Sequence, residues 1–173
     1  MKVFLASSCE LNHEREYLAS VVFYLGRLLH DMGLEQRVEL VKWEYLDSSM
    51  GMEHKQTEYN HELAACDATV VLFWRKFGEY TASELQTALQ GVRTGGSIRR
   101  LVVLFKDAGE PIPSELMDCR LSLSAERGIM TESFSSDDEL RAKFLSVVFA
   151  MLAEDDPSFN VPPHHTLAKY GLA

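Results

Sequence analysis

One acidic residue beside three aromatic residues is the clearest candidate for a catalytic group in this sequence. Residues 74–84 read Trp-Arg-Lys-Phe-Gly-Glu-Tyr-Thr-Ala-Ser-Glu. A carboxylate held near the anomeric carbon of a sugar can stabilise an oxocarbenium-like centre or attack it, which makes Glu84 the candidate catalytic residue. The rings of Trp74, Phe77 and Tyr80 can stack on planar bases, and we expect Trp74 and Tyr80 to contact a substrate.

Glu84 also has a purely structural explanation. Thr81 and Glu84 match the S/T-x-x-E pattern of a capping box, in which the acid accepts a hydrogen bond from a backbone N–H at the start of a helix. The same placement predicts that Glu84 lies in the first helical turn, where the helix dipole stabilises its anion. From the residues alone, catalysis and capping are both open for Glu84.

Two serines and a second tryptophan are further candidates for substrate contacts. Ser7 and Ser8 follow the first predicted strand, where hydroxyl and backbone N–H groups can bind a phosphate or a ribose hydroxyl; a serine-rich turn without function is the alternative. No glycine follows that strand, so a dinucleotide or Walker-type fingerprint is not supported. Trp43 ends the second predicted strand and offers a further aromatic surface for contact with a substrate. No C-x-x-C pair occurs, and we expect no metal site.

Strands and helices alternate along the chain, and this pattern decides where those residues meet. Continuous apolar runs indicate strands buried on both faces, and apolar residues at helical spacing follow each of them. We therefore predict an α/β fold, a flavodoxin-like three-layer sandwich with a five-stranded parallel sheet in the order 2-1-3-4-5. The predicted strands cover 2–6, 38–43, 68–73, 101–105 and 128–134, and the predicted helices cover 12–32, 54–65, 81–92, 114–118 and the region after Ser136.

The strand order predicts a ligand site between the first and third strands. In open parallel sheets, ligands bind outside the carboxyl ends of the strands, where the order reverses. Ser7 and Ser8 should therefore lie beside the segment from Trp74 to Glu84. We expect residues 1–155 to form this domain, and we expect residues 156–173, with three prolines, to form a C-terminal tail or linker outside the core.

Composition limits the partners of the chain. Its 173 residues carry a formal net charge of −9, which argues against nucleic acid and anionic membranes as partners. No apolar run approaches the roughly 20 residues of a membrane span, and the apolar part of the N-terminus is too short for a signal peptide. We therefore expect a cytoplasmic protein, in which the three cysteines are reduced thiols.

Several segments of residues 2–92 together resemble a known family. They are similar to TIR-like modules found at the N-termini of bacterial multi-domain defence and signalling proteins. The closing segment resembles the one that carries the catalytic glutamate in TIR domains that hydrolyse NAD, with Tyr80 at the aromatic position and Glu84 at the glutamate. The likeness is carried by residues 3–15, 43–48, 58–60, 66–67 and 76–84.

The resemblance implies an NAD glycohydrolase that cleaves the nicotinamide–ribose bond, with a linear or a cyclic product. NAD would be the substrate and no further cofactor is implied. The loop 44–53 would correspond to the mobile loop through which TIR domains self-associate. Two alternatives stay open. The related fold of nucleoside deoxyribosyltransferases implies a Glu84 nucleophile acting on other nucleosides, and a non-catalytic TIR-like module would only bind partners.

Overall fold

A five-stranded parallel sheet forms the centre of the molecule. The computed structural model describes residues 1–42, 60–126 and 129–173. The order β2-β1-β3-β4-β5, parallel throughout, confirms the predicted flavodoxin-like topology. The strands are β1 (Lys2–Ser7), β2 (Glu39–Val41), β3 (Ala68–Phe73), β4 (Arg100–Lys106) and β5 (Ile129–Phe134).

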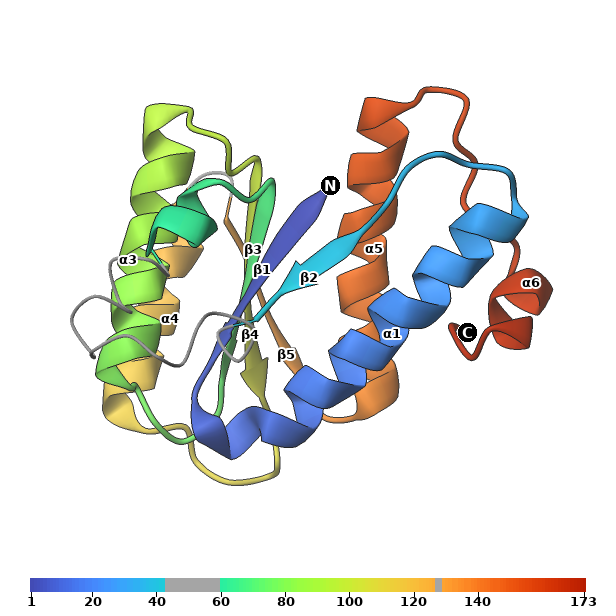
Figure 1. Cartoon of the computed structure of the whole chain (residues 1–173). Helices are drawn as coiled ribbons and strands as arrows, with labels where there is room; N and C mark the ends of the chain where they lie inside the picture. The colour runs from blue at the N-terminus through green and yellow to red at the C-terminus, as the bar shows by residue number, and fades with distance from the viewer. Residues whose placement is uncertain (43–59, 127–128) are drawn as a thin grey trace, which may run out of the picture.

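Helices cover both faces of the sheet and complete three layers (Figure 1). Neighbouring strand residues point to opposite faces, so Val3 and Leu5 enter one core cluster while Phe4 and Ala6 enter the other. Both faces are therefore apolar, as the continuous hydrophobic runs predict. One face carries α1 (Asn12–Asp31), preceded by the short η1 (Cys9–Leu11), and α5 (Asp137–Asp155); the other carries α3 (Glu79–Thr94) and α4 (Ser114–Ser124).

Some predicted boundaries differ from the structure. The helix expected from Thr81 begins at Glu79, because the extended backbone of Gly78 places the N-cap there. The α4 helix runs six residues beyond its predicted end at Asp118. Residues 60–64 are helical, whereas Trp43, the loop 44–53 and the start of the second predicted helix lie outside the described residues.

The expectation that residues 156–173 stay outside the core is wrong. They contain α6 (His164–Lys169), and they bury Phe159 and Leu172 in the same cluster as the apolar faces of α1 and α5. The Tyr170 hydroxyl also donates a hydrogen bond to Asp31 Oδ2 at 2.6 Å. Phe159 and Leu172 are isolated apolar residues in a proline-rich segment and do not belong to a helical or alternating pattern. The sequence therefore did not predict this packing.

We expect Leu172→Ala to lower the free energy of unfolding by about 2 kcal/mol or more, since a fully buried leucine is truncated. Urea unfolding of the whole chain measures this effect. Val161→Ala is the matched control, because Val161 belongs to the same segment but is 57% exposed. If both variants are as stable as the wild type, the segment does not contribute to the core in solution.

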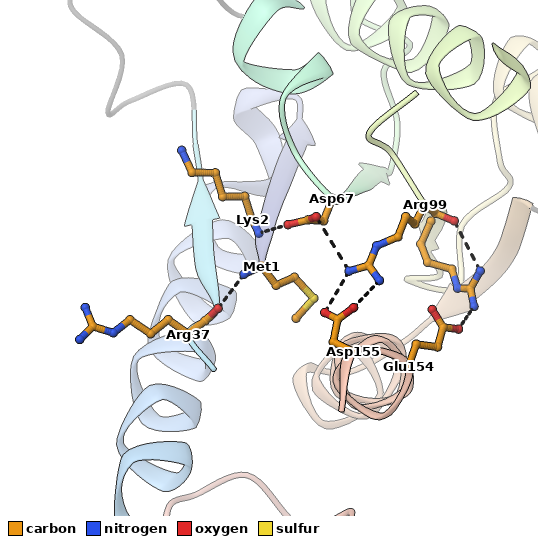
Figure 2. Close-up of polar contacts among 8 residues, drawn as sticks. Met1, Lys2, Arg37, Asp67, Arg99, Glu154 and Asp155 are labelled. Atoms are coloured by element: carbon orange, nitrogen blue, oxygen red, sulfur yellow. Dashed lines mark hydrogen bonds and ion pairs between the residues drawn. The ribbon is translucent and has the colours of Figure 1, made fainter. Parts of the chain in front are cut away.

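Ion pairs close the edge of the sheet at the amino ends of its strands (Figure 2). Asp67 accepts a hydrogen bond from the Lys2 backbone N–H at 2.7 Å. Arg99 donates to both Asp155 carboxylate oxygens, at 2.6 and 3.1 Å, and Arg100 binds Glu154. These contacts join the last turn of α5 to the start of β4, and the residue before β3 to β1. The opposite edge, at the carboxyl ends, is therefore where the candidate site must be sought.

Candidate active site

The turn after β1 and the loop after β3 are joined at the carboxyl edge of the sheet. Ser7 pairs with Leu72 in the parallel ladder. Glu10 Oε1 then accepts hydrogen bonds from the backbone N–H groups of Arg75 and Lys76, at 2.9 and 3.0 Å. These contacts confirm that the turn containing Ser7 and Ser8 lies beside the loop that leads to Glu84.

Glu84 does not cap a helix. The α3 helix begins at Glu79, and its N-cap is Gly78, which has no side chain to cap that end. Glu84 therefore lies in the second turn, and the predicted capping box with Thr81 is wrong. Glu84 is only 5% exposed and Thr81 only 3%, so both side chains point into the protein rather than along the start of the helix. The capping explanation for an acid at this position is thereby removed.

The environment of Glu84 favours its neutral form. Burial raises the pKa of the Glu84 carboxyl to about 8, while the positive charge of Arg15 acts in the opposite direction. No described residue donates a hydrogen bond to this carboxyl. The expectation that Glu84 lies in the first helical turn, where the helix dipole would stabilise its anion, is wrong, because α3 begins at Glu79. The acid is mostly protonated at neutral pH.

Arg15 was not predicted as part of the site. Its side chain is 2% exposed and lies under the turn after β1. Nη1 donates to Ser7 Oγ and to the Ser8 carbonyl oxygen, both at 3.2 Å, and Nη2 donates to Asn12 Oδ1 at 3.0 Å. Arg15 follows Leu11 and precedes Leu18 on the apolar stripe of α1, and a cation on such a stripe was the signal that could have identified it.

The two candidate serines differ in their hydrogen bonds. Ser7 Oγ accepts from Arg15, as described above, whereas Ser8 Oγ is buried without a partner in the described part of the chain. Buried hydroxyl groups are almost always hydrogen-bonded, so an unsatisfied one is a candidate for contact with a ligand. Ser8 is therefore the stronger of the two predicted substrate contacts.

The predicted aromatic contacts that the structure describes lie in different places. Tyr80 lies one turn before it on α3 and is 53% exposed. The Trp74 ring packs against the core cluster beneath α1 and α5, on the other side of the sheet from α3. The Arg75 guanidinium and the Lys106 ammonium lie 4.2 and 4.5 Å from the centre of that ring. Phe77 packs on Phe73, with ring centres 5.4 Å apart.

A second buried acid lies near Trp74 but is paired. Glu14 is 2% exposed and accepts a hydrogen bond from Lys106 Nζ at 2.5 Å. Glu84, which lacks such a partner within the described ranges, is the acid available for chemistry. Within those ranges no three side chains of the metal-binding types gather, and no helix is both long and apolar enough to cross a membrane.

Comparison of the chain with models of protein families, with curated proteins and with solved structures found no match. The site must therefore be interpreted from its own geometry.

Proposed function

We propose that this chain is an NAD glycohydrolase in which Glu84 is the catalytic residue. The observation that carries the proposal is the burial of the Glu84 carboxyl, without a hydrogen bond from the described residues, at the ligand-binding edge of the sheet. Burying a carboxyl without partners costs free energy, and acids with strongly shifted pKa values gather at functional sites. The resemblance of residues 76–84 to the catalytic segment of NAD-hydrolysing TIR domains supports the same residue.

The charge of the substrate suits this acid. The nicotinamide ring of NAD is cationic, and a nearby cation favours the carboxylate over the neutral acid. Binding of NAD would therefore draw the proton from Glu84, whose pKa near 8 makes that step easy at neutral pH. A neutral nucleoside brings no such charge, which favours NAD over the nucleoside substrates of deoxyribosyltransferases.

The reaction can then be written in balanced form. The bond between C1′ and the nicotinamide nitrogen breaks, and its electron pair stays on the nitrogen, so nicotinamide leaves as a neutral molecule. The positive charge moves to the ribosyl centre, which the Glu84 carboxylate stabilises. Water attacks C1′ and releases a proton, giving ADP-ribose; attack by an adenine nitrogen of the same molecule gives a cyclic product instead.

The direct test is to incubate concentrated protein with NAD and to follow nicotinamide by chromatography. Release that depends on Glu84 supports the proposal. A parallel assay with pairs of nucleosides and free bases tests transfer of the sugar. Activity only in this second assay would replace NAD as the substrate, and inactivity in both assays would favour a module that only binds partners. Self-association and a role in defence or signalling rest on the resemblance alone.

Ser8→Ala is expected to raise KM for NAD about tenfold if the unsatisfied hydroxyl contacts the substrate. This change corresponds to a loss of about 1.4 kcal/mol in the free energy of substrate binding. The variant should be as stable as the wild type, because no internal hydrogen bond is lost. Initial rates and thermal melts on the same preparations measure both effects.

Ser7→Ala is the matched control for that variant. It removes the acceptor of a hydrogen bond from Arg15, so it should lose about 1.5 to 3 kcal/mol of stability. An unchanged KM in Ser8→Ala would contradict the assignment of Ser8 as a substrate contact.

A further inference from the structure

We propose that the loop after β3 contains a phosphate-binding site, and that the Glu10 carboxylate occupies this site in the structure. The site is built from the backbone N–H groups of Arg75 and Lys76, and Glu10 reaches it from the turn after β1. In the proposed reaction the site takes the diphosphate of NAD. That assignment rests on the proposed function, whereas binding of a phosphate group is a property of the folded protein and is testable without turnover.

Two consecutive backbone N–H groups of this loop point at a single oxygen atom. The N–H groups of Arg75 and Lys76 both donate to Glu10 Oε1, at 2.9 and 3.0 Å. Successive N–H groups that converge in this way form a concave anion site, of the kind that binds phosphate oxygens in nucleotide-binding loops. A carboxylate oxygen and a phosphate oxygen are both anionic acceptors. Glu10 therefore marks the position that a phosphate oxygen would take.

The side chains of the loop and of the neighbouring turn suit an anion. Lys76 is exposed, and its ammonium has no partner in the part of the chain that the structure describes. Arg75 is half-exposed and pairs with Glu110 Oε2 at 2.5 Å. The Ser8 hydroxyl, which is buried without a described partner, belongs to the same turn as Glu10. A phosphate that replaces Glu10 would have two cations on its own loop and a hydroxyl donor in the turn beside it.

The position of these N–H groups in the fold is that of a ligand site. The order of the sheet reverses between β1 and β3, and parallel sheets bind ligands outside the carboxyl ends of the two strands at such a point. Glu10 joins the segments that follow these two strands. A carboxylate that only fastens the two segments together is the alternative, and its removal would leave the affinity for phosphate unchanged.

The wild type tests the site through its own amide signals. During titration with inorganic pyrophosphate, the largest changes in the ¹H–¹⁵N NMR spectrum should be those of the Arg75 and Lys76 N–H groups, because these groups exchange one anionic acceptor for another. The carboxyl ¹³C signal of Glu10 should change over the same concentrations, since Glu10 is displaced. No response at millimolar pyrophosphate, or changes confined to other N–H groups, would overturn the proposal, even if a Glu10 variant does not fold.

Glu10→Ala should bind pyrophosphate about tenfold more tightly than the wild type, because the apparent affinity of a site is reduced to the fraction of molecules in which the site is open. Glu10→Gln should lie between the two proteins, since a neutral amide oxygen is a weaker acceptor than a carboxylate. Isothermal titration calorimetry measures the three dissociation constants. Equal affinities in the wild type and Glu10→Ala would mean that Glu10 only fastens the loop, and would overturn the proposal.

Glu79→Gln is the matched control for the loss of a negative charge. Glu79 is exposed, lies three residues after Lys76 in the first turn of α3, and is not the acceptor of the two N–H groups. Its affinity for pyrophosphate should stay within about twofold of the wild type, because exposed charges are screened by salt. An equal gain in Glu79→Gln and Glu10→Ala would show that net charge alone sets the affinity, and would overturn the proposal.

Activity separates this proposal from the proposed function. Nicotinamide riboside has the same scissile bond as NAD but no phosphate. If the wild type releases nicotinamide, Glu10→Gln should lower KM for NAD about threefold and leave KM for nicotinamide riboside unchanged. Tighter pyrophosphate binding in Glu10→Ala with no turnover in any protein contradicts the NAD reaction and leaves the phosphate site supported. Turnover of NAD without binding of pyrophosphate at the Arg75 and Lys76 N–H groups contradicts the phosphate site alone.

Discussion

Replacing Glu84 by glutamine is expected to lower nicotinamide release from NAD by about a hundredfold or more. Glutamine has nearly the same shape but cannot become an anion, so it cannot stabilise a cationic ribosyl centre. Because the capping role is excluded by the start of α3 at Glu79, a loss of activity in this variant cannot be attributed to a lost helix cap. Initial rates at saturating NAD measure the effect on kcat.

Glu79→Gln is the matched control for this variant. Glu79 is an exposed acid in the first turn of the same helix, and its replacement removes one negative charge without changing a buried side chain. Its turnover should stay within about twofold of the wild type, since surface substitutions away from a site have small effects. Near wild-type turnover in Glu84→Gln would remove the central residue from the enzymatic interpretation.

The stability of the protein is expected to fall as the pH rises from about 5 to about 8, because of Glu84. The pKa of this carboxyl is raised from its ordinary value of 4.5 to about 8 in the folded protein. Between these values the folded state binds a proton that the unfolded state has released, so the free energy of unfolding decreases with pH, by roughly 1.4 kcal/mol per unit. Above the folded pKa this slope disappears.

Glu84→Gln isolates this contribution, because glutamine does not titrate. The difference in unfolding free energy between wild type and variant, from urea unfolding at several pH values, should change in favour of the variant as the pH rises. All other titrating groups are shared and cancel from that difference. A difference that is constant with pH would show that the Glu84 carboxyl is solvated in the folded protein, and would contradict the environment described for it.

The elements themselves were predictable because their signals are local. The predicted range of β3, 68–73, agrees with the structure, since a strand buried on both faces must be apolar throughout. The capping box of α5 was equally visible: Ser136 Oγ accepts from the Glu139 N–H at 3.2 Å. In an ideal capping box the acid accepts a hydrogen bond from the N–H of the N-cap residue, which here is Ser136. Glu139 instead accepts from the N–H of the preceding residue, Ser135, at 2.7 Å.

The capping box assigned to Thr81 shows where a local pattern is insufficient. The three-residue spacing is the same as in α5, but α3 starts two residues before Thr81, after Gly78, and the tertiary fold buries both side chains. Which of two equivalent patterns caps a helix depends on where the preceding loop ends. That loop is held by Glu10, which lies far away in the sequence.

The sequence by itself determined the sheet, its order and the edge at which the turn after β1 lies beside the loop after β3, because periodicity and right-handed crossovers leave few topologies. Only the tertiary structure decided that Glu84 is buried and largely neutral, that Arg15 lies beneath the serine turn, and that Phe159 and Leu172 belong to the core. The physical reason is that solvation and charge at a residue depend on groups brought near by the fold, and no local pattern of residues encodes them.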